Sequence, residues 1–201
     1  MARHYERSET RRRQIAEAAL RVISDHGLSG FTTKAIAAEV GITDGTLFRH
    51  FRDKEEIVLA SIEILKARMF DQTPSLPADP VEALEVLFRS RARFIGAERA
   101  IGRLVFSDEL ARVGGPEGQA SLQELRLRTL EQLAGLIGAA RVQGRLLETR
   151  LDDLQLAQLV MGQLLTFGVG RSLDHRLGRA ELEAMIERAW ETLAVLLFRA
   201  V

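Results

Sequence analysis

The segment from residue 32 to residue 54 constrains the fold more than any other part of the chain. It reads Thr-Thr-Lys-Ala-Ile-Ala-Ala-Glu-Val-Gly-Ile-Thr-Asp-Gly-Thr-Leu-Phe-Arg-His-Phe-Arg-Asp-Lys. Two short amphipathic stretches, each opened by a threonine, are separated at Gly41. Two helices joined by a short turn that contains glycine form a helix-turn-helix, whose second helix enters the major groove of DNA. The segment therefore predicts a helix-turn-helix that binds double-stranded DNA.

Helical periodicity continues on both sides of this segment. Apolar residues at three- and four-residue spacing predict a first helix over about 8–26 and a fourth helix over 54–71. Thr32 is expected to cap the second helix. Thr43 is expected to cap a recognition helix of two turns that ends around residue 50.

The remainder of the chain also carries helical patterns. Residues 73–80 hold three of the four prolines and mark a boundary. Alternating β-branched runs and hairpin turns are missing after it. Five further helices are expected, over 80–97, 99–113, 117–143, 152–174 and 179–199. The sequence thus predicts an all-α protein of about nine helices. A DNA-binding domain is expected over 1–55, continuing into the connecting helix 54–71, and a C-terminal helical domain over 72–201.

Composition narrows the class of protein. The chain has no cysteine, which excludes disulfides, cysteine-ligated zinc and thiol catalysis and fits a cytoplasmic protein. No apolar run reaches 18 residues and the N-terminus has no apolar signal region, so no membrane association is expected. Only four histidines occur, with neither a glycine-rich phosphate loop nor a His-Glu-x-x-His pattern. No enzyme activity, metal or cofactor is therefore expected.

The charge distribution permits nucleic-acid binding without requiring it. The net charge is zero, which by itself does not favour a nucleic-acid partner. Residues 1–13 carry five arginines against two glutamates, a local balance of +3. Because salt screens exposed charges beyond about 8–10 Å, such a local patch is sufficient to attract phosphates. This basic arm is either a DNA contact or an ordinary solvated helix start.

Signature positions at fixed spacing run through residues 12–55. They are Arg12, Ile15, Ala18, Ala19, Gly27, Thr32, Thr33, Ile36, Ala37, Gly41, Ile42, Thr43, Gly45, Thr46, Leu47, Phe48, Phe51, Lys54 and Glu55. Over roughly residues 8–65 their order and spacing resemble the TetR/AcrR family of bacterial transcriptional regulators. The resemblance implies a homodimer that binds an inverted-repeat operator. It also implies a C-terminal core that encloses a small-molecule pocket, and two last helices that pair with those of the partner.

Ten residues of the matched segment are expected to contact DNA: Thr33, Lys34, Thr43, Asp44, Gly45, Thr46, Phe48, Arg49, His50 and Lys54. Thr33 and Lys34 suit phosphates, although Thr33 alternatively only caps a helix. Arg49 matches the two acceptors of guanine, O6 and N7, or contacts a phosphate. His50 and Lys54 are expected on phosphates, and Gly45 lets the backbone approach DNA closely.

Two residues depart from the family pattern. Phe48 stands where the family usually has tyrosine, so the phenolic hydroxyl that commonly reaches a phosphate is missing, while stacking on sugar and thymine methyl remains. Asp44 stands where a neutral or basic residue is usual. Its carboxylate either accepts from a cytosine N4 amine or acts only locally at the helix dipole.

The C-terminal part carries two candidate surfaces. Effector-pocket candidates, each of which is alternatively ordinary core, are Met69, Phe70, Phe88, Arg91, Phe94, Phe106, Leu130 and Phe167. Apolar stripes on the last two helices suit half of an intermolecular four-helix bundle or an intramolecular core. The candidate dimer residues are Leu159, Gly162, Gln163, Leu182, Ile186, Ala189, Trp190 and Leu193.

Together these features predict a sequence-specific DNA-binding regulator. The expected mechanism is a repressor that binds a palindromic operator as a homodimer and is released by an unidentified small-molecule effector. The alternative is a DNA-binding protein of the same fold whose C-terminal domain engages a protein partner. An enzyme with an accessory DNA module is disfavoured by the composition.

Overall fold

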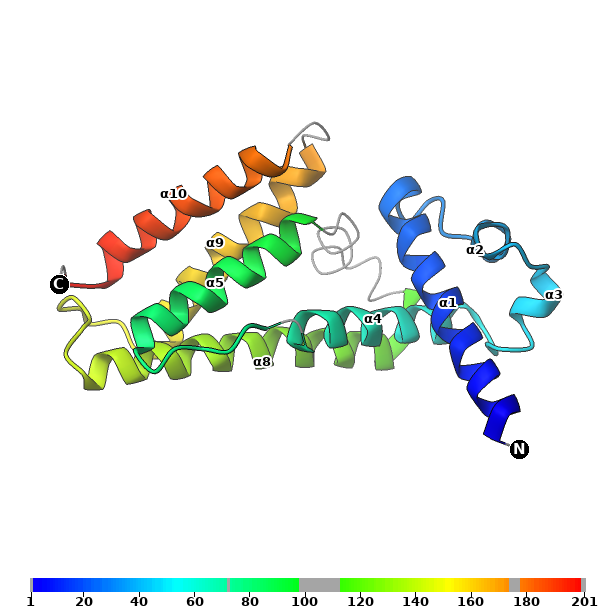
Figure 1. Ribbon diagram of the computed structural model, residues 1–201, viewed down its shortest axis with the longest axis horizontal. Coiled ribbons are helices and arrows are strands. Elements are labelled where there is room, and N and C mark those ends of the chain that lie inside the picture. Colours follow the sequence, from blue (N-terminus) through cyan, green and yellow to red (C-terminus); the bar gives the residue numbers. More distant parts are fainter. Residues whose placement is uncertain (1, 72, 98–112, 174–177, 200–201) are drawn as a thin grey trace. The chain divides into compact units, whose positions relative to one another are not determined.

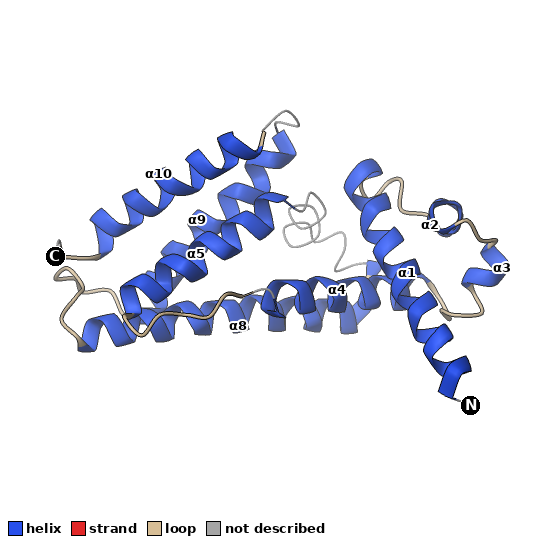
Figure 2. Ribbon diagram, in the orientation of Figure 1, coloured by secondary structure: helices blue, strands red, loops and turns tan. Residues whose placement is uncertain are grey.

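The computed structural model of the chain describes residues 2–71, 73–97, 113–173 and 178–199 (Figure 1). It divides into two compact units. The first comprises Met1–Asp71 with Arg99–Leu125, and the second comprises Gln72–Glu98 with Arg126–Val201. Every regular element among the described residues is an α-helix (Figure 2), and one isolated bridge pairs Leu146 with Phe198. The predicted all-α class is confirmed.

The first unit is built around helix α1 (Ala2–His26). This helix packs against α2 (Thr33–Val40) and α4 (Lys54–Asp71), and α2 packs in turn against α3 (Asp44–Leu47) (Figure 1). Apolar residues at helical spacing form one core, which contains Ile15, Ala19, Ile23, Phe31, Ile36, Leu47, Phe51, Ile57 and Ile62. Burial of this shared core is what holds the two short helices α2 and α3, since helices of this length have little stability of their own.

Two helices of the first unit differ from expectation. Helix α1 starts at Ala2, before the expected start near residue 8, because apolar periodicity marks only the packed part of a helix. Helix α3 is α-helical only over Asp44–Leu47, where two turns were expected. Residues 48–50 instead form a tighter turn, with hydrogen bonds from Arg49 N to Thr46 O (3.2 Å) and from His50 N to Leu47 O (2.9 Å). The helical path is kept, but its last turn is not regular α-helix.

The second unit contains α5 (Pro80–Ala97), α9 (Asp153–Leu173) and α10 (Arg179–Leu197), with α5 packed against both of the others. Helix α8 (Gly115–Val142) begins in the first unit and continues without interruption into the second. These bounds agree closely with the helices predicted from sequence. The predicted helix over 99–113 lies almost entirely outside the described residues.

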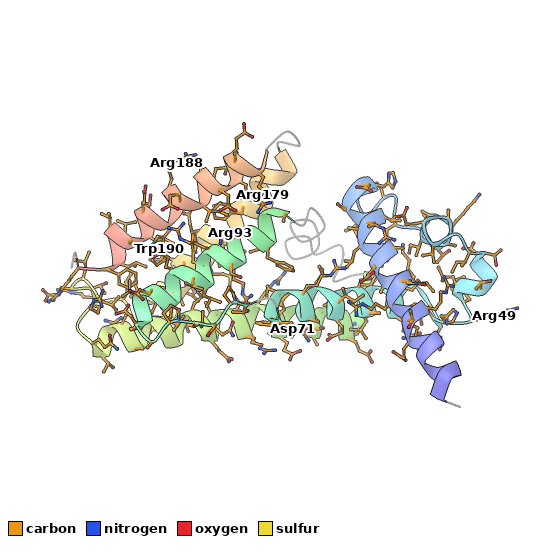
Figure 3. The ribbon with its side chains drawn as sticks, viewed as in Figure 1. Arg49, Asp71, Arg93, Arg179, Arg188 and Trp190 are labelled. Carbon is orange, nitrogen blue, oxygen red and sulfur yellow. The ribbon has the colours of Figure 1, made fainter. Side chains whose placement is uncertain are left out.

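Aromatic side chains join the three helices of the second unit. The Phe88 ring of α5 lies 6.2 Å from Phe167 of α9 and 5.8 Å from Trp190 of α10, measured between ring centroids. Five residues further along α5, Arg93 (labelled in Figure 3) pairs with Glu183 of α10 at 2.9 Å. Aromatic contacts of this geometry each contribute about 0.5–1.5 kcal/mol beyond the burial of their area. The inner face of α10 is therefore occupied by its own chain.

Candidate nucleic-acid interface

The helix-turn-helix predicted from sequence is formed by local hydrogen bonds. The Thr32 hydroxyl accepts the backbone N–H of Ala35 at 3.1 Å and caps α2. Gly41 then adopts a left-handed conformation, with φ of 73°, which ends α2 and suits a residue without Cβ. The Thr43 hydroxyl accepts the backbone N–H of Thr46 at 3.2 Å and caps α3. Both predicted threonine caps are confirmed.

Burial separates the residues of this segment into two faces. Ile36, Leu47 and Phe51 are buried in the core of the first unit. The predicted DNA contacts lie outside this core: Lys34, Thr43, Asp44, Gly45, Phe48 and Arg49 are exposed, whereas Thr33, Thr46, His50 and Lys54 are half-buried. Phe48 keeps 48% of its surface exposed, so its ring lies on this outer face. The unit thus presents one continuous stretch of chain with a mixed polar and aromatic outer face.

Gly45 lies on this outer face, and nothing within the fold requires a glycine at this position. Its φ is not in the left-handed region, and a Cβ built on it would approach only the Thr43 hydroxyl, at 4.0 Å. Alanine would therefore fit the isolated protein. The space left by the missing side chain is available to a molecule that approaches α3 from outside.

Asp44 and Arg49 flank the same outer surface. Asp44 is the first residue of α3, and Figure 3 shows Arg49 projecting outward beyond the end of that helix. Neither side chain makes a hydrogen bond or an ion pair to the described parts of the chain. A cation that is exposed and not held by a carboxylate can reach a base edge or a phosphate without first breaking an internal contact.

Residues 43–50, which comprise the cap, α3 and the turn after it, are called the recognition segment, and His50 lies at its end among cationic side chains. Its Nδ1 is buried and has no hydrogen-bond partner within the described residues. Burial, followed by the charges of Arg11, Arg12 and Arg49, lowers the pKa of His50 below its ordinary value. The ring is therefore held neutral near pH 7, and Nε2 remains as the nitrogen that can donate to a phosphate.

Lys54 is engaged inside the unit. Its ammonium nitrogen lies 4.6 Å from the centroid of the Phe31 ring, a cation–π arrangement. Partial burial lowers the pKa of Lys54. The structure thus gives this lysine a packing contact in addition to the phosphate contact expected from sequence.

Hydrogen bonds that link α1 to the loop before α4 and to α4 itself were not predicted from the sequence. Arg12 donates a hydrogen bond to Glu56 at 2.7 Å, and Glu56 N–H donates to Asp53 Oδ1 at 2.9 Å. The sequence placed Arg12 in the basic arm and among the signature positions, without a structural role, and did not identify Glu56. The available signal was the spacing Asp53-x-x-Glu56 at the start of a helix, which resembles a capping box.

The predicted pocket residues do not all lie in one unit. Met69 and Phe70 belong to the first unit, and Phe106 lies outside the described residues. The remaining five belong to the second unit, where Phe88, Arg91 and Phe167 are buried and Phe94 and Leu130 are half-buried.

Arg91 is the unusual member of that set. It is only 1% exposed, and one terminal nitrogen donates to Gln132 Oε1 at 3.2 Å. Burial and the nearby charge of Arg128 lower the pKa of Arg91 to about 10. Its guanidinium therefore belongs to the interior of the second unit.

The predicted dimer residues are also divided by burial. Leu182, Ile186, Ala189, Trp190 and Leu193 are buried within the chain, because α10 turns this stripe toward α5. They have almost no surface left to offer a partner. Leu159 is 55% exposed and Gly162 is exposed, whereas Gln163 is half-buried. The exposed large apolar residues of α10 are Val195 and Leu196; the apolar stripe predicted for this helix included Leu196 but not Val195.

Membrane-spanning helices and metal clusters are both absent from the part of the chain that the structure describes. Among those residues, no helix is both long and apolar enough to cross a membrane. Within the same residues, no three His, Asp or Glu side chains gather in a way that could hold a metal ion.

Comparison with known proteins places the helix-turn-helix in a family. Residues 15–61 match the family model described as bacterial regulatory proteins, tetR family. The HTH-type transcriptional repressor AcnR of Corynebacterium diphtheriae is 29% identical over 126 residues, which cover 63% of this chain and 66% of that protein. The chain thus spans slightly less than two thirds of the length of this curated relative.

Solved structures share the fold over nearly the whole chain. The structure of AibR in complex with isovaleryl coenzyme A and operator DNA has a TM-score of 0.74 at 22% identity, covering 92% of this chain and 97% of that chain. A transcriptional regulator from Saccharomonospora viridis in complex with choline has a TM-score of 0.77 at 19% identity, covering 96% of this chain and 100% of that chain. At these identities the likeness shows the fold alone. Residues 15–61 thus match the DNA-binding domain of the tetR family, and over a longer stretch the chain is similar to curated transcriptional repressors.

Proposed function

We propose that the protein is a sequence-specific repressor that binds a palindromic operator as a homodimer and is released from it by a small-molecule effector. The observation that carries the proposal is the outer face of α2 and α3. There, Lys34, Asp44 and Arg49 stand exposed on a segment whose other face is fixed in the core. A rigid scaffold that presents unoccupied polar groups is what reading base edges requires.

Each half-site contact follows from the chemistry of this face. Arg49 suits guanine O6 and N7, and Asp44 suits a cytosine N4 amine in the same groove. Thr33, Lys34 and the Nε2 of the neutral His50 ring can each donate a hydrogen bond to a phosphate. Thr43 and Thr46 offer hydroxyls from the first turn of α3, although the two side chains already lie 3.0 Å apart. Lys54 contributes to phosphate binding if its ammonium moves away from Phe31.

The homodimer is proposed to form through the exposed faces of α9 and α10. Leu154 and Leu159 on α9 are 49% and 55% exposed, and Val195 and Leu196 on α10 are 76% and 65% exposed. Exposed Gly162 adds a position where a second helix can approach closely, since nothing lies within 4 Å of a Cβ built there. Exposed leucines and valines near a glycine suit a helix from a partner, and two-fold symmetry would then match a palindromic site.

Transmission of an effector signal is proposed to use α8. This helix runs from the first unit into the second. Its beginning is tied to α4, where Lys66 donates to Glu124 at 2.6 Å and Ser121 donates to Glu63 at 2.6 Å. An effector that reshapes the second unit around α8 would therefore also shift α4, which directly follows the recognition segment. The ligand must bind the two conformations with different affinities for this shift to occur.

A small-molecule effector is supported by the fold relatives, because AibR is bound to isovaleryl coenzyme A and the Saccharomonospora viridis regulator to choline. The alternative is a protein partner for the second unit. That alternative is favoured by exposed Leu127 and Val142 on α8, which are 50% and 90% exposed. The protein is proposed to act in the cytoplasm, where its DNA target lies.

Selection of bound duplexes from a random DNA pool tests the proposal. Enrichment of a palindrome would support a dimeric, sequence-specific regulator, and release of the selected duplex by one member of a metabolite panel would support induction. Enrichment without any symmetric motif would contradict the operator model. Replacing Leu159 by Arg provides the matched test of the interface, with loss of the dimer in analytical ultracentrifugation as the expected result. A dimer unaffected by this variant and by Val195→Arg would place the interface elsewhere.

A further inference from the structure

Arg12, in the middle of α1, is held against the end of the recognition segment by three contacts. One terminal nitrogen donates a hydrogen bond to the backbone carbonyl of His50. The other donates to Oε1 of Glu56 at 2.7 Å. The guanidinium carbon also lies 4.2 Å from the centroid of the Phe51 ring. A guanidinium can make all three contacts at once because it combines donors in a fixed fork with a flat cationic face.

Glu56, in the first turn of α4, extends this arrangement into the preceding loop. Its Oε2 accepts the backbone N–H of Arg52 at 2.7 Å. The hydrogen bond from Arg52, followed by the contacts of Arg12, holds the pKa of Glu56 below its ordinary value, so the carboxylate stays ionised. One side chain of α1 is thereby linked to both ends of the loop that joins α3 to α4.

The neighbouring arginine, Arg11, differs in every one of these contacts. It makes no hydrogen bond or ion pair to the described residues, yet its charge acts on His50. Arg11 therefore has the properties of a phosphate ligand. Arg12 uses both terminal nitrogens inside the protein, so binding a phosphate would require it to give up the His50 carbonyl or Glu56.

The recognition segment needs stabilising contacts from outside because its regular helix is so short. The contacts of Arg12 with the His50 carbonyl and with Glu56, called the tie below, provide them. Only Asp44–Leu47 is α-helical, and the next residues form a tighter turn. A single helical turn has little stability of its own. The carbonyl that Arg12 binds belongs to His50, at the end of this turn, where a cation also interacts favourably with the helix dipole.

We propose that Arg12 and Glu56 act as positioning residues that fix the recognition segment for base reading, and that Arg12 is not a phosphate ligand. The inference rests on the proposed function, namely that this segment reads DNA. Base contacts depend on the orientation of α3 to within about 1 Å, whereas phosphate contacts carry no sequence information. Loosening the tie should therefore lower discrimination between sequences more than it lowers overall attraction to DNA.

The test compares five variants of the protein. Three are Arg12→Lys, Arg12→Met and Glu56→Gln, the fourth combines Arg12→Met with Glu56→Gln, and the fifth, Arg11→Met, is a matched control on the same helix. Affinity is measured by fluorescence anisotropy for the selected duplex and for a scrambled duplex, over a range of salt concentrations, at a temperature where circular dichroism shows each variant folded. Arg12→Lys is the decisive change, because lysine keeps the charge that a phosphate contact needs but lacks the fork that bridges two acceptors.

We expect Arg12→Lys, Arg12→Met and Glu56→Gln each to lower the ratio of selected to scrambled affinity by about tenfold, the order of magnitude of one base contact. The dependence of log Kd on log salt should stay as in the wild type. Arg11→Met should instead weaken both duplexes alike and reduce that slope by about 0.9 for each phosphate that the variant no longer neutralises. The double variant Arg12→Met/Glu56→Gln should lose no more than either single variant, because the two residues act as one unit.

Two results would overturn the inference. One is a salt slope that falls in Arg12→Met and is restored in Arg12→Lys, which would make Arg12 a phosphate ligand. The other is an unchanged discrimination ratio in Arg12→Lys and Glu56→Gln, which would reduce the tie to a contribution to stability alone. If the wild-type protein discriminates between no duplexes at all, the proposed function itself fails, and that result is distinct from either of these.

Discussion

Replacing Gly45 by alanine should raise the stability of the protein and weaken its binding to DNA. Gly45 has helical geometry, is exposed and leaves at least 4.0 Å between a Cβ and the nearest side-chain atom. Because alanine is about 0.8–1.0 kcal/mol more favourable than glycine inside a helix, the free energy of unfolding should rise by up to about that amount. For a chain of this size, that corresponds to a rise of roughly 1–4 °C in the midpoint of thermal unfolding.

DNA binding should change in the opposite direction. If backbone atoms of α3 contact the operator at this position, the added methyl group must displace them. Overpacking of a close contact costs about 1–3 kcal/mol, which is about 5- to 150-fold in Kd for each half-site. Thermal unfolding followed by circular dichroism measures the first effect, and anisotropy with the selected duplex measures the second.

Gly135 provides a matched control for this experiment. It lies in α8, is exposed, and has nothing within 4 Å of a Cβ built on it. Gly135→Ala should raise the unfolding midpoint by a similar amount and leave Kd unchanged. Wild-type affinity in Gly45→Ala would refute the reasoning, since it would mean that no part of the operator approaches the backbone at Gly45.

Three further predictions follow from single contacts. Asp44→Ala should change the base preferred at one operator position if the carboxylate reads cytosine; tighter binding with unchanged preference in a repeated duplex selection would contradict this. The pKa of His50 is lowered in the folded protein, so the unfolded chain takes up a proton at this residue more readily than the folded protein does. The contribution of His50 should therefore lower the free energy of unfolding as the pH falls through about 6.5, and urea titrations from pH 7.5 to 5.5 should show a smaller loss in His50→Gln. Gly115, with φ of 60° and a Cβ position only 2.7 Å from Glu55 Oε2, should not accept alanine; Gly115→Ala should lower the free energy of unfolding by about 1–3 kcal/mol, and a stability unchanged in urea denaturation would contradict that strain.

Local signals in the sequence predicted most of the first unit. Thr32, Gly41 and Thr43 act through atoms of their own neighbourhood, so their caps and turn could be read directly from residue type and spacing. Helix α4 was predicted with its observed bounds for the same reason. The tie from Arg12 to Glu56 spans 44 residues, and no local pattern reports a contact over that separation.

The dimer residues show a different limit of sequence reasoning. The apolar stripe of α10, including Ile186 and Trp190, correctly marks a face that is covered. Periodicity cannot say whether the covering helix belongs to the same chain or to a partner. In the structure α5 covers most of it, while Leu196, which the stripe included, and Val195, which it did not, are exposed. Arg91 poses a similar problem, because an arginine on a helix is usually exposed and only tertiary packing buries it.

Hydrogen–deuterium exchange with and without the selected duplex tests the central claim most directly, because amides in short, exposed helices exchange readily until they are covered. We predict that peptides from residues 32–54 become protected in the complex, with additional protection at the part of α1 that carries Arg11. Protection confined to the second unit, with residues 32–54 exchanging as fast as in the unbound protein, would contradict the claim that this segment binds the operator.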